Sequence, residues 1–416
     1  VGSVFAMLVF GALSLSTHGD EPAPHFIENG QAQGCIVLAA GDTTTVEAAE
    51  RLQALLLDAT GVTVPLAPTP GENPGLEIRL GWSDDAKAAA PDLASDAFVW
   101  KTLEDGSLVI GGPGKGTLYG TIAFAEEHLG MRFYAPALMR IPKHEVVDLP
   151  RLDEIRRPAF PVRWVHMPAA EDQAWCEWHG VHSRAHRNTS WGMFVHTFEH
   201  LVRPEDHFEE HPEYFSEVRG KRLPNMQLCL TNEDVFRLVV DGLRQRMARR
   251  PDAKLWSVSQ NDRHGACECE HCTALVEKHG SQAGPLITFV NRVAAAFPDK
   301  TISTLAYTYT RRAPRDLKPA PNVNVCLCSI ECDRAEPLAG SQRNADFVRD
   351  IREWRALTSN LMIWDYVVQF SNYVSPFPNF HVLQPNIQLF RDHDVQLMFQ
   401  QGSGSSRSDL SELKQY

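Results

Sequence analysis

Residues 347–366 have the sequence FVRDIREWRALTSNLMIWDY and decide the fold, because they combine a helix with the strand that follows it. The first part places apolar side chains on one helical face, at Phe347, Ile351, Trp354 and Leu357. Leu361–Tyr366 is a short apolar run of the kind found in strands buried on both faces. A helix that ends just before a buried strand is the repeating unit of a parallel sheet.

The same alternation continues on both sides of this unit. Helical patterns separate eight candidate strands: Val162–His166, Met193–His196, Gln227–Leu230, Leu255–Gln260, Thr301–Tyr309, Val323–Ile330, Leu361–Tyr366 and Val395–Gln400. Eight strands alternating with helices predict a (β/α)₈ TIM-type barrel over residues 151–416. Because the sequence stops soon after the eighth strand, we expect the barrel to be truncated there at its C-terminal end.

Residues 25–150 predict a separate, smaller α/β sandwich domain. Cys35–Ala40 and Glu77–Gly81 resemble strands, and Phe98–Ile110 contains two strand-like runs around Asp105-Gly106, a hairpin signal. Residues 1–24 begin with an apolar run shorter than the ~20 residues of a membrane span. We interpret this segment as a signal peptide, with a buried helix or a lipidated anchor as alternatives. The expected location is therefore secreted or periplasmic.

Composition narrows the class of protein further. The chain has 416 residues, a formal net charge of −12 and 43% hydrophobic residues, which is typical of a globular protein with a large core. No Lys/Arg-rich run is present, so we expect no nucleic-acid partner. The segments after the leader include none that could span a membrane. The sequence indicates no oligomeric state.

Carboxylates follow three of the clearest strands. Asp262 follows the fourth strand, Glu331 the sixth, and Asp365 lies at the end of the seventh. Working residues of such barrels lie at the carboxyl ends of the strands, and glycosidic bond cleavage needs two carboxyl groups flanking the sugar. We therefore predict Asp262, Glu331 and Asp365 as catalytic candidates. The alternative is that they cap helices or pair with nearby arginines.

Polar and aromatic residues near the same strand ends are candidates for substrate binding. Aromatic rings can stack on the apolar face of a sugar, whereas histidine, amide and guanidinium groups can bind its hydroxyl and carboxylate groups. The candidates are His196, Asn261, Tyr307, Arg311, Trp364, Tyr366 and Gln400. For each aromatic residue, packing in the core is the alternative.

The nine cysteines are the least usual feature. Cys267, Cys269 and Cys272 follow the fourth strand, and Cys328 and Cys332 the sixth, so these five could meet above the barrel. Three thiolates and a fourth Cys or His suit structural zinc, whereas export would favour disulfides. Disulfides, structural zinc and free thiols stay open, and we expect no catalytic cofactor.

Several motifs resemble the family named domain of unknown function 4838, whose members occur in carbohydrate-related proteins. The matching stretches are HFEEHPEYF (207–215), QLCLTN (227–232), SVSQND (257–262), CECEHC (267–272), LCSIEC (327–332), WDY (364–366) and PFPNFH (376–381). Residues 116–120 and 127–133 are similar to the N-terminal domain of family 67 α-glucuronidases. The second resemblance implies an inverting mechanism, with Asp262 as the acid where that family has Glu, and Glu331 or Asp365 as the base.

Taken together, these features predict an exported glycoside hydrolase. Its expected substrate is a polysaccharide or a uronic-acid-decorated oligosaccharide, cleaved by carboxylate acid/base catalysis. Two alternatives remain: a carbohydrate-binding barrel without catalysis, and a metal or redox protein centred on the cysteines.

Overall fold

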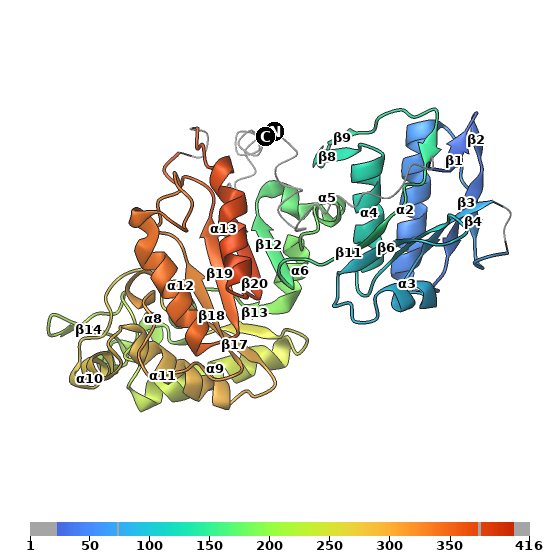
Figure 1. Ribbon diagram of the computed structural model, residues 1–416. Helices are drawn as coiled ribbons and strands as arrows, with labels where there is room; N and C mark the ends of the chain where they lie inside the picture. The colour runs from blue at the N-terminus through green and yellow to red at the C-terminus, as the bar shows by residue number, and fades with distance from the viewer. Residues whose placement is uncertain (1–22, 73–74, 373–375, 403–416) are drawn as a thin grey trace. The chain divides into compact units, whose positions relative to one another are not determined.

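The structure is a computed structural model that describes residues 23–72, 75–372 and 376–402. The described chain forms two compact units, one comprising residues 23–161 and 169–181, the other residues 162–168 and 182–402 (Figure 1). Most of the expected signal peptide, residues 1–22, lies outside the described residues. Within the described ranges, no helix has both the length and the apolar character needed to cross a membrane.

The first unit is built on a six-stranded mixed sheet with the strand order β11-β6-β7-β5-β3-β4. Its strands are β3 (Gly34–Leu38), β4 (Leu66–Ala67), β5 (Leu76–Leu80), β6 (Phe98–Thr102), β7 (Leu108–Gly111) and β11 (Asp153–Arg156). Two small sheets join β10 (Val147–Asp148), β1 (His25–Glu28) and β2 (Gln31–Ala32), and β8 (Arg132–Ala135) with β9 (Leu138–Arg140). The helices are α2 (Thr43–Thr60), α3 (Asp84–Ala89), α4 (Gly116–His128) and α5 (Gln173–Trp178).

Alternation along the strands gives this sheet two covered faces. Ile78, Ile110 and Trp100 belong to the core that includes α2 and α4. Val99 and Val109, which neighbour Trp100 and Ile110 in sequence, pack instead with Ala86 of α3. Because successive side chains of a strand point to opposite faces, α3 and the α2–α4 pair lie on opposite sides of the sheet. The expected α/β sandwich is therefore present.

Glu126 in α4 gives this unit a pH-dependent stability. Burial raises the pKa of the Glu126 carboxyl to about 7, although Arg132 Nε lies 3.6 Å from Oε1. A raised folded-state pKa means that stability present below pH 4.5 is lost as the pH rises through 7. We expect Glu126→Gln to increase the free energy of unfolding at pH 8 by about 2 kcal/mol, with no gain at pH 4.

Urea unfolding at the two pH values measures this effect. Glu50→Gln, which changes an exposed carboxylate of α2, is the matched control and should change stability little at either pH. An equal gain from Glu126→Gln at pH 4 and pH 8 would contradict the burial argument.

The second unit contains a seven-stranded parallel sheet with the order β12-β20-β19-β18-β17-β16-β13. These strands are β12 (Val162–His166), β13 (Trp191–Met193), β16 (Leu255–Ser257), β17 (Thr301–Ala306), β18 (Val323–Cys328), β19 (Leu361–Tyr366) and β20 (Leu397–Gln401). The helices are α6 (Arg184–Ser190), α7 (Phe198–Leu201), α8 (Pro204–His207), α9 (Glu233–Arg249), α10 (Glu270–His279), α11 (Ala283–Ala295), α12 (Ala345–Leu357) and α13 (Phe380–Asp392). A short hairpin joins β14 (Glu217–Val218) to β15 (Lys221–Arg222).

The sheet confirms the expected class, a TIM-like half-barrel preceded in the chain by a small α/β domain, but one predicted strand is wrong. Residues 227–230 do not enter the parallel sheet, and β13 pairs directly with β16. The backbone of Ser216 donates to Gln227 O, and that of Cys229 donates to Tyr214 O. The segment therefore pairs with residues 214–216 in an antiparallel bridge, which a parallel barrel strand could not do.

The strand ends differ from the prediction in smaller ways. β12 and β19 have the predicted bounds, whereas β16, β17 and β18 end two or three residues earlier than expected. The second strand lies at Trp191–Met193 instead of 193–196. Residues 258–262 and 307–310 therefore belong to the loops at the carboxyl ends of the parallel strands. We call this end of the sheet the rim.

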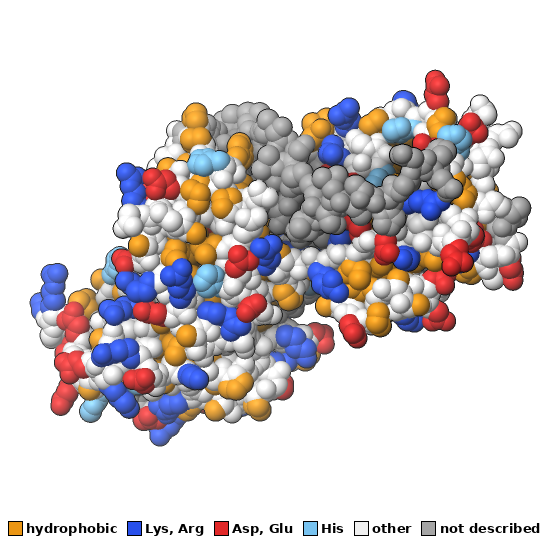
Figure 2. All heavy atoms as spheres, viewed as in Figure 1, with side chains coloured by type: hydrophobic (Ala, Val, Ile, Leu, Met, Phe, Trp, Pro, Cys, Tyr) orange, Lys and Arg blue, Asp and Glu red, His pale blue; other side chains and the backbone are white. Residues whose placement is uncertain are grey.

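The interior of the curled sheet is lined with aromatic and sulfur-containing side chains. Trp164, Trp191, Cys328, Tyr366 and Phe399 belong to one buried cluster there. Trp164 and Trp191 lie 6.2 Å apart and join β12 to β13, two strands without a mutual ladder in the described sheet. On the outside, acidic and basic side chains are interspersed over the described surface visible in Figure 2.

Candidate active site

Asp262 lies in the loop after β16 and has an exposed side chain. Its exposed fraction is 67%, and the Tyr307 hydroxyl donates to Oδ1 over 3.0 Å. His196 Nε2 lies 4.0 Å from the same oxygen. Burial, followed by the hydrogen bond to Asp262, raises the pKa of the Tyr307 phenol, so Tyr307 remains a donor at neutral pH. The structure thus brings together three residues predicted for the site.

The loop that follows β16 holds His196 in place. His196 has a φ of 56°, in the left-handed region that is uncommon for residues other than glycine. Its backbone N–H donates to Ser259 Oγ, and Nδ1 lies 2.8 Å from Gln260 O. A carbonyl can only accept, so Nδ1 carries the proton and Nε2 faces Asp262. Strained backbone of this kind is frequent at functional sites.

Asn261 and Gln227 fix the backbone on both sides of Asp262. The Asn261 side chain accepts from the Glu199 backbone and donates to Met226 O. Gln227 Oε1 accepts from the Asn261 backbone, and its Nε2 donates to the carbonyls of Asn261 and Arg263. Asn261 is 5% exposed and these contacts hold the backbone of the loop, whereas its predicted contact with a substrate stays a prediction.

Glu331 follows β18 and is held by an arginine that also contacts a buried acid. Arg311 NH1 lies 3.1 Å from Glu331 Oε2, and Arg311 Nε lies 2.8 Å from Asp350 Oδ2. The Glu331 side chain is 40% exposed, whereas that of Asp350 is 1% exposed. Arg311 was predicted to bind a substrate carboxylate, but these two partners occupy its guanidinium group. Its contacts favour a role in orienting Glu331.

Asp365 lies on the opposite face of its strand from the barrel interior. Its neighbours Trp364 and Tyr366 pack with the interior cluster, so Asp365 points the other way. It is 4% exposed, accepts from Ser329 Oγ over 2.7 Å and has Gln400 as its register partner on β20. Burial raises the pKa of the Asp365 carboxyl. The structure therefore does not bring Asp365 and Gln400 together with Asp262.

Aromatic rings surround the inner part of the rim. Trp364 is partly exposed and lies 5.5 Å from Phe194 and 5.9 Å from Tyr366, measured between ring centroids. Trp364 Nε1 donates to Gln401 Oε1, and Tyr366 is 7% exposed. Of Trp364 and Tyr366, Trp364 therefore has the greater access to a ligand.

Arg187 and Phe194 lie at the interior cluster and were missed at the sequence level. Arg187 of α6 places its guanidinium carbon 5.1 Å from the Phe194 ring centroid and 5.2 Å from that of Phe399. Burial, and then Arg184, lower the pKa of Arg187, and none of the described carboxylates pairs with it. Arg187 lies in helix α6, and Phe194 lay inside the predicted strand Met193–His196 and not at its end, so the search of strand ends selected neither.

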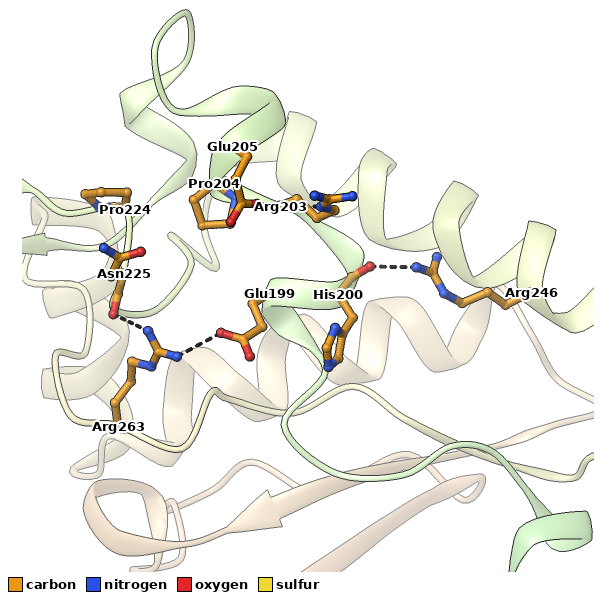
Figure 3. A pocket seen from close by; sticks show the side chains of 9 residues that line it. All are labelled: Glu199, His200, Arg203, Pro204, Glu205, Pro224, Asn225, Arg246 and Arg263. Carbon is orange, nitrogen blue, oxygen red and sulfur yellow. Dashed lines mark hydrogen bonds and ion pairs between the residues drawn. The ribbon is translucent and has the colours of Figure 1, made fainter.

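A polar pocket of about 610 Å³ lies beside the Asp262 loop (Figure 3). It is lined by Glu199, His200, Arg203, Pro204, Glu205, Pro224, Asn225, Arg246 and Arg263. Arg263, the residue after Asp262, donates to Glu199 Oε2 over 2.9 Å and to Asn225 O over 2.8 Å. Figure 3 shows the Arg263 and Glu199 side chains pointing toward one another. Three arginines line the pocket, and one of them, Arg263, belongs to the loop that carries Asp262.

The cysteines form a different group from the one predicted. Cys267, Cys269 and Cys272 meet Cys229, and the four sulfur atoms all lie within 4.8 Å of one another. Cys328 belongs to the interior cluster and Cys332 lies beyond β18, so these two are not in the group. The prediction failed because Cys229 was assigned to a barrel strand, whereas its antiparallel segment carries it to the loop after β16.

Comparison with known proteins identifies the family of this region. Residues 133–416 match the family described as "Domain of unknown function (DUF4838)". No curated protein matches the sequence.

Solved glycoside hydrolases are similar to the chain at low identity. A family GH115 4-O-methyl-α-glucuronidase, BtGH115A, has 14% identity and a TM-score of 0.44, over 94% of this chain and 56% of its own. The N-acetyl-β-hexosaminidase of Streptomyces plicatus has 12% identity and a TM-score of 0.43, over 94% and 86%. A family 89 glycoside hydrolase from Clostridium perfringens has 10% identity and a TM-score of 0.43, over 90% and 48%. The chain thus spans 56% of the length of the glucuronidase.

Proposed function

The chain belongs to the domain of unknown function 4838 family, whose match includes the whole rim described above, and we propose that this rim is the active site of a glycoside hydrolase. The proposed substrate is a polysaccharide or an oligosaccharide decorated with uronic acid. Export of the protein is part of the same proposal, because such substrates lie outside the cell.

One observation carries the proposal: two accessible carboxylates follow strands that flank β17. Asp262 follows β16 and Glu331 follows β18, and Tyr307 follows β17 between them. Tyr307 contacts Asp262 directly, and the charge of Glu331 contributes to the raised pKa of its phenol. Two carboxyl groups that flank the scissile bond are what glycoside hydrolysis requires, and barrel enzymes carry such groups at the carboxyl ends of their strands.

The contacts of the two carboxylates suggest different roles. Glu331 carries the Arg311 ion pair and would act as the base, removing a proton from the water that attacks the anomeric carbon. Asp262, protonated, would give its proton to the glycosidic oxygen as the bond to the leaving group breaks. Tyr307 and His196 would orient Asp262. We propose an inverting outcome because the resemblance to family 67 enzymes implies one, with water attacking from the side of the sugar opposite the acid.

Arg187 supports the uronic-acid part of the proposal, because it is a half-buried cation among aromatic rings with no acidic partner among the described residues. A sugar stacked on Trp364 or Phe194 could direct a carboxylate toward it. We expect Arg187→Met to raise KM for uronic-acid substrates about tenfold and for neutral glycans less than threefold.

Steady-state kinetics on matched charged and neutral oligosaccharides measures this difference. Arg244→Met, which changes an arginine of α9 that is 62% exposed, is the control and should alter neither KM. Equal effects of Arg187→Met on both substrates would remove the argument for recognition of a uronic acid.

A substrate screen tests the proposal as a whole. Full-length protein would be incubated with uronic-acid-decorated and neutral oligosaccharides, and the released sugar would be followed by proton NMR from the first minutes. The expected result is release of sugar in the inverted anomeric form. Binding of glycans without any release would replace the hydrolase by a carbohydrate-binding barrel.

A further inference from the structure

Four cysteine sulfurs converge at one point of the second unit. Cys229 comes from the segment that pairs with residues 214–216, whereas Cys267, Cys269 and Cys272 come from the loop after β16 and the start of α10. The Sγ atoms of Cys229 and Cys269 lie 3.7 Å apart, and all four lie within 4.8 Å of one another. Three of the residues are at most 9% exposed.

The separations fit a tetrahedral metal centre. With Zn–S distances of about 2.3 Å, the sulfurs of a tetrahedral zinc site lie about 3.8 Å apart. A disulfide would instead require two sulfurs to approach to about 2.05 Å. Each sulfur here has three sulfur neighbours at comparable range, which is the geometry of one four-ligand site and is unlike two separate pairs.

The surroundings supply hydrogen-bond donors and a positive charge to the sulfurs. The Glu217 backbone N–H donates to Cys267 Sγ over 3.4 Å, and Arg222 donates to the same sulfur over 3.6 Å. The Thr231 hydroxyl lies 3.3 Å from Cys272 Sγ. Cys269 precedes α10, whose N-terminus favours negative charge. Four thiolates around Zn²⁺ carry a net negative charge, which these donors and the guanidinium group would stabilise.

We infer that Cys229, Cys267, Cys269 and Cys272 bind a structural zinc ion. All four ligands come from the protein, so no coordination position is left for a substrate or a water. The ion would join the segment at residues 227–230 to the loop at 261–272, two parts of the chain that only side-chain and loop contacts otherwise hold together.

This zinc ion would also position the rim. Gln227, two residues before Cys229, holds the backbone of Asn261 and Arg263 on either side of Asp262. A zinc ion that fixes Cys229 against Cys267 therefore fixes Gln227 against the Asp262 loop. The binding of zinc is independent of the proposed hydrolase activity, and only this consequence for Asp262 rests on it.

The test uses the full-length chain purified without chelator. Elemental analysis should find about one zinc per chain in the wild type and in Cys176→Ser, and much less in Cys272→Ser. Cys176 is the matched control because its buried thiol lies outside the group and its hydrogen bond to Ala170 O suits serine. Replacement of the metal with Co²⁺ should give the visible absorption of a tetrahedral thiolate centre.

The wild-type protein decides the matter even if Cys272→Ser does not fold. Absence of metal together with two disulfides in the intact mass, or with four freely alkylated thiols, would overturn the inference. Hydrogen exchange provides a readout without activity: removal of zinc should speed exchange at residues 227–230 and 261–263 at least tenfold, and leave α12 unchanged. Unchanged exchange in the first two segments would refute the positioning role, and zinc content would still be measured separately.

Discussion

Asp262→Asn is expected to lower kcat on the hydrolysed glycan by about 10²–10⁴-fold, the usual contribution of a general acid. The asparagine keeps the size of the side chain and can still accept from the Tyr307 hydroxyl, as Asp262 does over 3.0 Å. It has no proton to give to the leaving oxygen. Because Asp262 is largely exposed, the substitution should change the free energy of unfolding by less than about 0.5 kcal/mol.

Glu331→Gln should cause a loss of similar size, since an amide cannot remove a proton from water. Asp365→Asn is the matched control, because Asp365 is also a carboxylate at a strand end but faces away from the interior. We expect it to retain activity within about tenfold. Steady-state kinetics and thermal unfolding of the three variants provide the comparison. A collapse of activity in Asp365→Asn alone would place the chemistry on the face of the sheet that carries Asp365, and would contradict the roles of Asp262 and Glu331.

Arg311→Met is expected to lower both stability and activity. Arg311 lies between Glu331 and Asp350, and Asp350 has a side chain only 1% exposed. Without Arg311, the charge of the buried Asp350 has only the half-exposed Arg349 as a partner, which costs about 3 kcal/mol. Glu331 also loses the guanidinium group that orients it, so kcat should fall at least tenfold in the protein that remains folded.

Arg349→Met is the matched comparison, because Arg349 is the second arginine that pairs with Asp350. Arg349 also contacts Asp350, over 3.0 Å, but its side chain is 45% exposed and it does not reach Glu331. Its loss should cost less than about 1 kcal/mol and leave kcat unchanged. Urea unfolding and kinetics on both variants check the pair. Equal destabilisation by the two substitutions would show that Arg311 contributes no more to the free energy of unfolding than the exposed Arg349.

The sequence predicted the elements whose patterns are local. β12 and β19 have the predicted bounds because each is a short apolar run with clear ends, and Asp262 and Glu331 became candidates because they follow strands. The polarity of Asp365 could not show which face it occupies: one residue of register decides whether a side chain enters the interior or the helix layer. Its burial against Ser329 is visible only in the folded sheet.

Hydrophobic periodicity could not predict which segments pair with one another when they lie far apart in the chain. Gln227–Leu230 has the composition of a strand, but it pairs with residues 214–216, and that antiparallel bridge brings Cys229 to the other three cysteines. The ion pair between Arg311 and Asp350 likewise forms only because α12, which carries Asp350, packs near the loop after β17. Contacts between segments far apart in the chain determine both outcomes.

Turnover measured beside binding, in the wild type, Asp262→Asn and Glu331→Gln, tests the central claim most directly. Sugar release would be followed by NMR and glycan affinity by calorimetry on the same preparations. The account predicts release by the wild type, and binding within about threefold but release reduced at least 100-fold in both variants. Release that persists in both variants, or a wild type that binds glycans and never cleaves them, would contradict it.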